Sequence, residues 1–411
     1  MDGPDWDLIS SYAGLVSLAT ASIVVGAFAS LSNSAQASTQ SQSETSTTEG
    51  EGDEEEDNGE RLSSEDAWLF PILGSVVLFG LYLVVKHLGK EWINWLLRWY
   101  FAIAGIGSVS KSSIALVKVT LGVKRWKAFD RTKILVLKGP RELLSLSWRS
   151  PSFLILPVAA IPSLLYTFHS ASRKSALLSN LLALSFSHNA LSLLKLDSFK
   201  TGCILLSGLF FYDIWWVFGT EVMLKVATTL DVPIKLLWPK SMFFSGTRGY
   251  TMLGLGDVVI PGTFISLALR YDYHRSKPGQ PIRRPYFIAA VVAYIAGLVT
   301  TMTVMHCFRK AQPALLYLSP ACILSFFITA VFQGELQDAW SWSDERRDGK
   351  GKSEAKDNLD SAVKDIANPD TSQTEKNGLG DHGAMAEHPS QGEVEVDGGD
   401  KPRKRRVKKK V

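Results

Sequence analysis

Apolar and polar positions fall into long separate blocks along this 411-residue chain. Nine apolar stretches are each about 20 residues long, which is the length a helix needs to cross a bilayer. We predict membrane spans near 12–31, 67–85, 92–110, 152–168, 176–194, 201–219, 250–269, 286–307 and 312–332. The end of the third span is open by several residues, because Arg98 interrupts it and Lys111 and Lys118 follow. The pattern predicts an all-α polytopic membrane protein with nine transmembrane helices.

Two hydrophilic blocks separate or follow these spans. Residues 32–66 are rich in Ser, Thr and Gln and then acidic, and residues 334–411 are polar with almost no aromatic residues beyond Trp340 and Trp342. Neither block has enough apolar surface to offset the entropy of ordering the chain, so we expect both to be disordered. The predicted regions are an N-terminal span (1–31), a disordered acidic loop (32–66), an N-terminal helical membrane region (67–175), a membrane core with the candidate site (176–333) and a disordered tail (334–411).

The distribution of basic residues predicts the orientation. Two connections on the same side of a nine-span protein carry the basic residues Lys124, Arg125, Lys127, Arg131, Lys133, Lys138, Arg141 and Arg149, and Arg270, Arg275, Lys277, Arg283 and Arg284. The positive-inside rule places that side in the cytosol, with the N-terminus outside or lumenal and the C-terminus cytosolic. Asp2, Asp5 and Asp7 precede the first span, so it lacks the basic region of a signal peptide and is expected to be retained.

Two aspartates lie inside apolar stretches, Asp213 in the sixth span and Asp257 in the seventh. A carboxylate in hydrocarbon costs roughly 2.5–3.5 kcal/mol even on the lenient insertion scale, which indicates a functional site. Counting helical rise from Glu221 and from Arg248 places both carboxyls roughly 12–14 Å below the same surface. The pairing predicts a catalytic dyad. The alternative is a proton-coupled transporter or channel that uses the same buried pair.

A carboxyl dyad suits peptide hydrolysis. Two carboxyls about 3 Å apart cannot both ionise cheaply, so one acts as general base on a water and the other donates a proton to the scissile carbonyl. Which aspartate holds the proton is open. A transmembrane substrate must unwind locally before its peptide bonds are accessible, and we expect it to pair as a strand with an extended segment, either 232–239 or the residues near Gly254.

Short motifs surround the two aspartates and the start of the ninth span. They are Tyr212-Asp213, Gly254-Leu255-Gly256-Asp257 and, after Gln312, Pro313-Ala314-Leu315. Together they resemble the presenilin and signal peptide peptidase family of intramembrane aspartyl proteases. The surrounding sequence over about 176–335, including MLGLGDVVIPGTFISLALRYD, is more similar to the signal peptide peptidase branch.

This resemblance implies a role for each motif. Asp213 and Asp257 would be the catalytic pair, with Tyr212, Gly254, Leu255 and Gly256 supporting the active site. Pro313, Ala314 and Leu315 would shape the wall where substrate enters. The implied enzyme is an aspartic endopeptidase of the endoplasmic reticulum membrane, oriented oppositely to presenilin, that cleaves signal-peptide remnants and type II membrane proteins. Homo-oligomers and quality-control complexes are open as partners, and no cofactor, metal or nucleic acid is expected.

Other features of the sequence fit this interpretation or a structural one. There is no His-Glu-x-x-His zinc motif, and the adjacent Ser187 and His188 lack the setting of an activated nucleophile and indicate packing. Cys203, Cys307 and Cys322 have no metal-ligand spacing and are expected to be free thiols. Lys408 and Lys409 match a dilysine retrieval signal, with a lipid-contacting basic end as the alternative.

Overall fold

The computed structural model of the chain describes residues 6–43, 61–87, 89–122, 125–126, 128–138, 141–168, 175–220, 222–223, 233–240, 249–276, 283–308 and 312–344. All of them belong to one unit, Met1–Ser353. The predicted retrieval signal, Lys408 and Lys409, lies outside the described residues, as does the rest of the tail from 345 onward. The extent of that tail's predicted disorder therefore stays a prediction.

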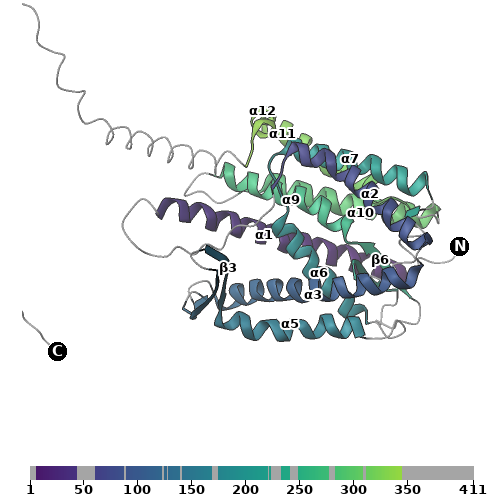
Figure 1. Cartoon of the computed structure of the whole chain (residues 1–411). Helices are drawn as coiled ribbons and strands as arrows, with labels where there is room; N and C mark the ends of the chain where they lie inside the picture. The colour runs from purple at the N-terminus through teal and green to yellow at the C-terminus, as the bar shows by residue number, and fades with distance from the viewer. Residues whose placement is uncertain are drawn as a thin grey trace, which may run out of the picture. The chain divides into compact units, whose positions relative to one another are not determined.

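Each predicted span overlaps one long helix (Figure 1). These helices are α1 (Trp6–Ser43), α2 (Ser64–His87), α3 (Lys90–Leu121), α5 (Ser150–Phe168), α6 (Ala176–Leu193), α7 (Phe199–Phe218), α9 (Gly256–Arg275), α10 (Pro285–Phe308) and α11 (Leu315–Gln333). A short helix, α12 (Leu336–Ser341), follows α11. In the described part of the chain, seven helices are long and apolar enough to cross a membrane, so the chain is a multi-pass membrane protein.

Helices α6 and α9 are the two long helices outside that set of seven, and their polar residues lie inside the protein. Asn189 of α6 donates hydrogen bonds to the backbone and side chain of Ser108 in α3, and Ser187 accepts one from Ser22 in α1. In α9, the stretch from Pro261 to Asp272 is buried throughout. Protein covers most of α9 and the polar side of α6, which removes the need for uniformly apolar sequence.

The fold is mostly helical, but three two-stranded sheets show that the all-α prediction was incomplete. Parallel strands β1 (Arg61–Leu62) and β4 (Lys195–Leu196) precede α2 and α7. Antiparallel β2 (Arg131–Lys138) and β3 (Arg141–Arg149) occupy the basic connection between α3 and α5. Antiparallel β5 (Lys235–Pro239) and β6 (Tyr250–Gly254) lead into α9. In β6, exposed and buried side chains alternate, which is typical of a strand.

Several predicted boundaries were wrong. Helix α1 continues through Ser43 into the predicted acidic loop, and α3 continues to Leu121. The predicted span 250–269 begins as strand β6, where each residue advances about 3.3 Å rather than 1.5 Å, so the helical depth count for Asp257 does not hold. The predicted tail begins with ordered structure, because α12 and the residues up to Asp344 pack onto the membrane core.

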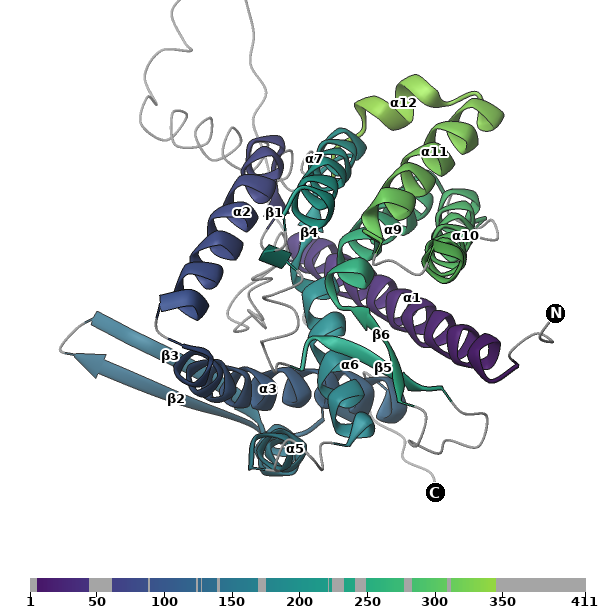
Figure 2. The same cartoon turned by 90° about the vertical axis from the view of Figure 1, so that its right-hand side faces the viewer.

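Helices α1 and α9 lie at the centre of this unit. Helix α1 contacts α6, α9, α10 and both strands β5 and β6, while α9 also contacts α7, α10 and α11 (Figure 2). Val258, Phe264, Ile265, Leu267 and Leu269 of α9 are fully buried. By contrast, α2 and α5 present exposed apolar side chains such as Val76 and Phe153, as expected for lipid-facing helices. The core thus holds α9 and its neighbours in place around the candidate site.

Candidate active site

Asp213 projects from α7 into the protein interior. Its exposed fraction is 5%, and its Oδ2 accepts a hydrogen bond of 3.2 Å from the backbone N–H of Leu315. Leu315 is the first residue of α11, and the first N–H groups of a helix have no partner within it. Asp213 therefore satisfies a donor that the start of α11 leaves free, across 102 positions of sequence.

Asp257 stands in the first turn of α9, directly after strand β6. It is half-buried, and its carboxyl turns back over Gly254, where an added Cβ would lie 3.2 Å from Oδ2. Helices α7 and α9 are in contact, and the two carboxylates interact electrostatically. Within the described residues no hydrogen bond reaches the Asp257 carboxyl. The structure thus brings both predicted acids and the start of α11 to one place.

The three motif residues at the start of α11 lie on one side of the candidate site. Pro313, Ala314 and Leu315 are all buried, with Ala314 capping the helix in a helical backbone conformation. Proline is well suited to precede a helix because it has no N–H to satisfy there. Leu315 therefore lies against Asp213, and the role of this motif as a wall of the site stays a prediction.

The remaining motif residues differ in their surroundings. Tyr212 faces α2, where its ring lies beside Gly74 and is tilted against Trp216 at a centroid distance of 6.3 Å. Leu255 caps α9, and its N–H donates to Ile234 ahead of β5. Around Gly256 the nearest atom to an added Cβ is Ile260 Cδ1 at 4.0 Å, so this glycine has room for a side chain. Gly254, not Gly256, is the glycine that the carboxyl crowds.

Strands β5 and β6 provide an extended segment next to Asp257, as expected from the sequence. Their register pairs Leu237 with Met252 and Lys235 with Gly254. Backbone bonds join Leu255 to Ile234 and Lys240 to Gly249, so alternation turns the backbone groups of Leu237, Met252 and Gly254 outward. The sheet therefore has two outer edges, and β6 leads directly to Asp257.

Only one of these edges is covered by α6. The side chain of Asn180 accepts from the N–H of Leu237 and donates to its carbonyl, both at 2.7 Å. On the opposite edge Met252 is 63% exposed, and no described residue bonds its outward N–H or carbonyl. Sequence reasoning missed Asn180, because an amide that closes a strand edge gives no local signal. Among the described residues of this sheet, the β6 edge is therefore the one open to a ligand.

Other candidate chemistry in the sequence is placed elsewhere. Ser187 is fully buried and bonded to Ser22, which supports packing rather than nucleophilic catalysis. Cys203, Cys307 and Cys322 are free thiols. Among the described residues no group of His, Cys, Asp and Glu could hold a metal ion. Tyr294 of α10, also missed by sequence reasoning, is fully buried in the neighbourhood of Asp257.

Comparisons with known proteins connect this geometry to a family. The family model described as signal peptide peptidase matches residues 54–346, which is most of the chain and contains every motif above. The chain belongs to the signal peptide peptidase family. Its relatives include the signal peptide peptidase of Homo sapiens, 37% identical over 316 residues that cover 75% of this chain and 81% of the human protein.

Proteins of other organisms are also similar to this chain. A probable intramembrane protease of Schizosaccharomyces pombe is 36% identical over 285 residues, covering 69% of this chain and 84% of its own. Intramembrane protease 2 of Caenorhabditis elegans is 47% identical over 178 residues, 41% of this chain and 38% of that protein. These relatives support an intramembrane protease function for this family member.

Proposed function

We propose that this chain is an aspartic endopeptidase that hydrolyses peptide bonds within membrane-spanning segments, with Asp213 and Asp257 as its catalytic pair. The observation that carries the proposal is the hydrogen bond from Leu315 N–H to Asp213 at 3.2 Å. This bond joins the motif that contains Asp213 to the one that contains Leu315. Contact between α7 and α9 brings the motif of Asp257 to the same place. A structural role for Asp257 is disfavoured, because a buried carboxyl kept for stability normally has hydrogen-bond donors around it.

The proposed chemistry needs only the two carboxyls and a water. The ionised aspartate removes a proton from the water, whose oxygen attacks the scissile carbonyl carbon, while the protonated aspartate donates its proton to the carbonyl oxygen. As the tetrahedral gem-diol collapses and the C–N bond breaks, the first aspartate gives its proton to the leaving nitrogen, and the second aspartate takes a proton back from a gem-diol hydroxyl, which re-forms the C=O bond. The pair regains one shared proton, so the cycle closes without a cofactor.

Strand β6 is the proposed docking edge for the substrate. Its outward backbone groups at Met252 and Gly254 can pair with an unwound substrate, and this would place the substrate backbone three residues before Asp257. Asn180 closes the β5 edge, which leaves β6 for the substrate. Segments that unwind at low cost, such as short signal-peptide remnants and the spans of type II membrane proteins, suit this demand.

The topology and location are part of the same proposal. We infer nine spans, because α6 and α9 run among helices that qualify as spans and are covered by protein. The basic connection before α5 and the one after α9 then face the cytosol, with the N-terminus in the lumen of the endoplasmic reticulum. The name of the human relative, signal peptide peptidase, supports signal peptides as substrates.

The test is cleavage of a synthetic transmembrane signal peptide by the purified full chain in lipid vesicles. Asp213→Asn and Asp257→Asn should each lower kcat/KM by about 100-fold or more, since general acid–base catalysis contributes factors of this order. Asp338→Asn, at an exposed aspartate of α12, is the matched control and should cleave like the parent. Products are identified by mass, which locates the hydrolysed bond.

The same vesicles can distinguish a protease from the alternative, a proton-coupled transporter. A pH-sensitive dye inside them reports proton flux, which the protease proposal predicts to be absent in the parent and in both variants. Substantial peptide cleavage by either aspartate variant would refute the dyad. Proton flux that disappears in the variants while cleavage persists would make transport the better account of the buried pair.

A further inference from the structure

The end of α9 far from Asp257 contains a buried arginine with two partners. Arg270 is 4% exposed, and its Nη1 lies 2.6 Å from Oδ2 of Asp344 while its Nη2 donates to the Leu196 carbonyl at 3.0 Å. Leu196 belongs to strand β4, just before α7. One guanidinium therefore connects α9, the approach to α7 and a residue beyond α12. Breaking such a buried pair is costly because it leaves a charge without its partner.

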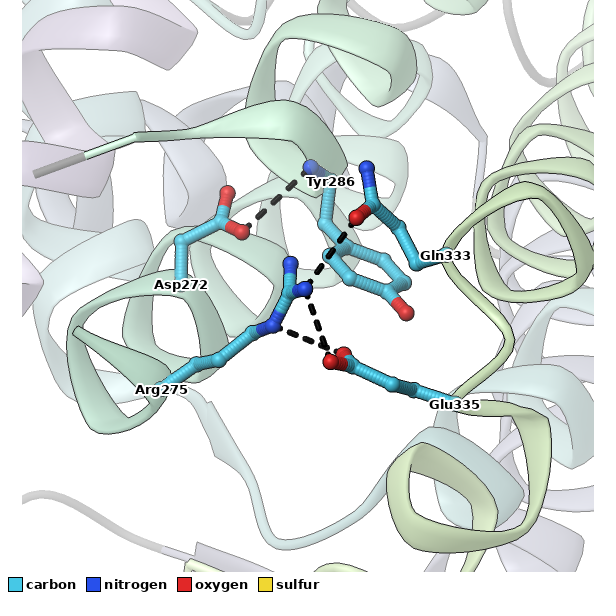
Figure 3. Close-up of polar contacts among 5 residues, drawn as sticks. All are labelled: Asp272, Arg275, Tyr286, Gln333 and Glu335. Carbon is cyan, nitrogen blue, oxygen red and sulfur yellow. Dashed lines mark hydrogen bonds and ion pairs between the residues drawn. The ribbon is translucent and has the colours of Figure 1, made fainter.

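A second arginine connects the same end of α9 to α11. Arg275 lies between Gln333 and Glu335, as Figure 3 shows. Its Nε is 2.7 Å from Glu335 Oε2, and its Nη2 donates to Glu335 Oε1 at 2.7 Å. Gly334 allows the turn between α11 and α12 through its left-handed backbone, with a φ of 69°. The chain after α11 is thus directed across the end of α9.

Residues 335–344, which we call the C-terminal clasp, also reach the start of α7. The N–H of Asp344 donates to the carbonyl of Asp197 at 2.7 Å, and Ser343 forms a β-bridge with Ser198. Ser198 is the residue that caps α7, since its side chain accepts from Thr201 N–H. The clasp is therefore bonded to the residues that begin the helix of Asp213.

An aromatic contact reinforces these polar ones. The ring of Trp342 lies 5.2 Å from that of Tyr271 in α9 and 6.1 Å from that of Phe199 in α7. Farther along, α7 and α9 approach closely, because an added Cβ at Gly202 would lie 2.7 Å from Phe264. The two helices are thus joined at one end by the clasp and held near it by direct contact.

We propose that the C-terminal clasp sets the alignment of α7 and α9, and that Arg270 and Asp344 are positioning residues for the catalytic pair. This inference rests on the proposed function. Asp257 and Arg270 are thirteen positions apart, about 20 Å along a helix, so a tilt of roughly 3° displaces a carboxyl by about 1 Å. A displacement of that size costs about 100-fold in rate when a reaction depends on two aligned groups.

The test uses full-length variants and the cleavage assay described above. Asp344→Asn should lower kcat about tenfold, with KM within about twofold, because substrate docks on β6 and not on the clasp. Asp344→Glu keeps the charge and should recover most of kcat. The exchanged pair, Arg270→Asp with Asp344→Arg, should cleave faster than either single variant. Asp338→Asn, in the same clasp but exposed, is the control and should match the parent.

Two readouts separate positioning from loss of folded protein. The first readout is labelling of the two aspartates by a transition-state isostere, which counts the active sites that are competent to bind it. The second is the ratio of the products cleaved at neighbouring peptide bonds, which does not depend on how many molecules are folded. We expect Asp344→Asn to change that ratio. A kcat per labelled site equal to the parent's, with an unchanged product ratio, would overturn the inference.

Failure of the clasp can be distinguished from failure of the proposed function. If the parent cleaves, Asp257→Asn does not, and Asp344→Asn behaves like the parent in both readouts, only the clasp is refuted. If Asp257→Asn still cleaves, the dyad itself is refuted, and the clasp inference is overturned with it.

Discussion

The two ends of α9 contain buried or half-buried charged side chains in opposite situations. At its C-terminal end Asp272 is 1% exposed and accepts from the backbone N–H groups of Phe287, at 2.8 Å, and Tyr286, at 3.4 Å. Arg270, nearby, has Asp344 and Leu196 as partners. At the other end, no described residue donates a hydrogen bond to Asp257.

The contrast teaches how to separate structural from chemical charges in one helix. Buried charges kept for stability are paired and hydrogen-bonded, because an isolated one costs several kcal/mol. Asp272 meets that condition by capping the start of α10. Asp257 does not, which leaves its oxygens available to water and substrate. Predictions about β6, Gly254 and the start of α11 test whether the open end behaves as a reaction site.

Among these three predictions, the largest effect is expected from closing the β6 edge. Met252→Pro removes an outward N–H without removing a bond of the β5–β6 ladder, and proline is tolerated at strand edges. It should raise KM and thereby lower kcat/KM by roughly 100-fold, because a lost backbone pair and a steric block oppose the addition of the substrate as a strand. Met252→Ala keeps the N–H and is the matched control. Equal kcat/KM for the two variants would rule out docking on β6.

A smaller effect is expected from crowding the Asp257 carboxyl. A Cβ at Gly254 would lie 3.2 Å from Oδ2, so Gly254→Ala should displace the carboxyl and lower kcat by roughly tenfold. Gly256→Ala is the control, since its Cβ would meet nothing closer than 4.0 Å and alanine favours a helix start over glycine. Single-turnover rates in vesicles give the comparison. A larger loss for Gly256→Ala would contradict this account of the site.

The smallest effect on catalysis is expected at the start of α11. Leu315→Ala preserves the backbone N–H that donates to Asp213 but empties a buried position, so it should lower stability by about 2–5 kcal/mol and kcat by a few fold. Pro313→Ala should loosen the entry to the helix and also lower kcat. Unfolding temperature and kcat are measured on the same preparations. Parent values of kcat in both variants would reduce the motif to an ordinary helix start.

Much of this fold could be predicted from the sequence because membrane helices are local features. The apolar stretches predicted every long helix, and Asp213 stood out because nothing in its surroundings explains a carboxylate. The closure of the β5 edge could not be predicted, because it depends on Asn180, more than fifty positions away in the sequence. The role of Asp344 was also hidden, since composition alone assigns it to the polar tail.

The central claim is that Asp257 performs chemistry whereas Asp272 maintains structure, and paired variants test it most directly. Cleavage and unfolding temperature are measured side by side for Asp257→Asn and Asp272→Asn in vesicles. The account predicts no cleavage and an unchanged or higher unfolding temperature for Asp257→Asn. For Asp272→Asn it predicts a lower unfolding temperature, because the lost hydrogen bonding reduces the free energy of unfolding by about 1–3 kcal/mol, with cleavage retained per folded molecule. Cleavage by Asp257→Asn, or its complete loss in folded Asp272→Asn, would contradict it.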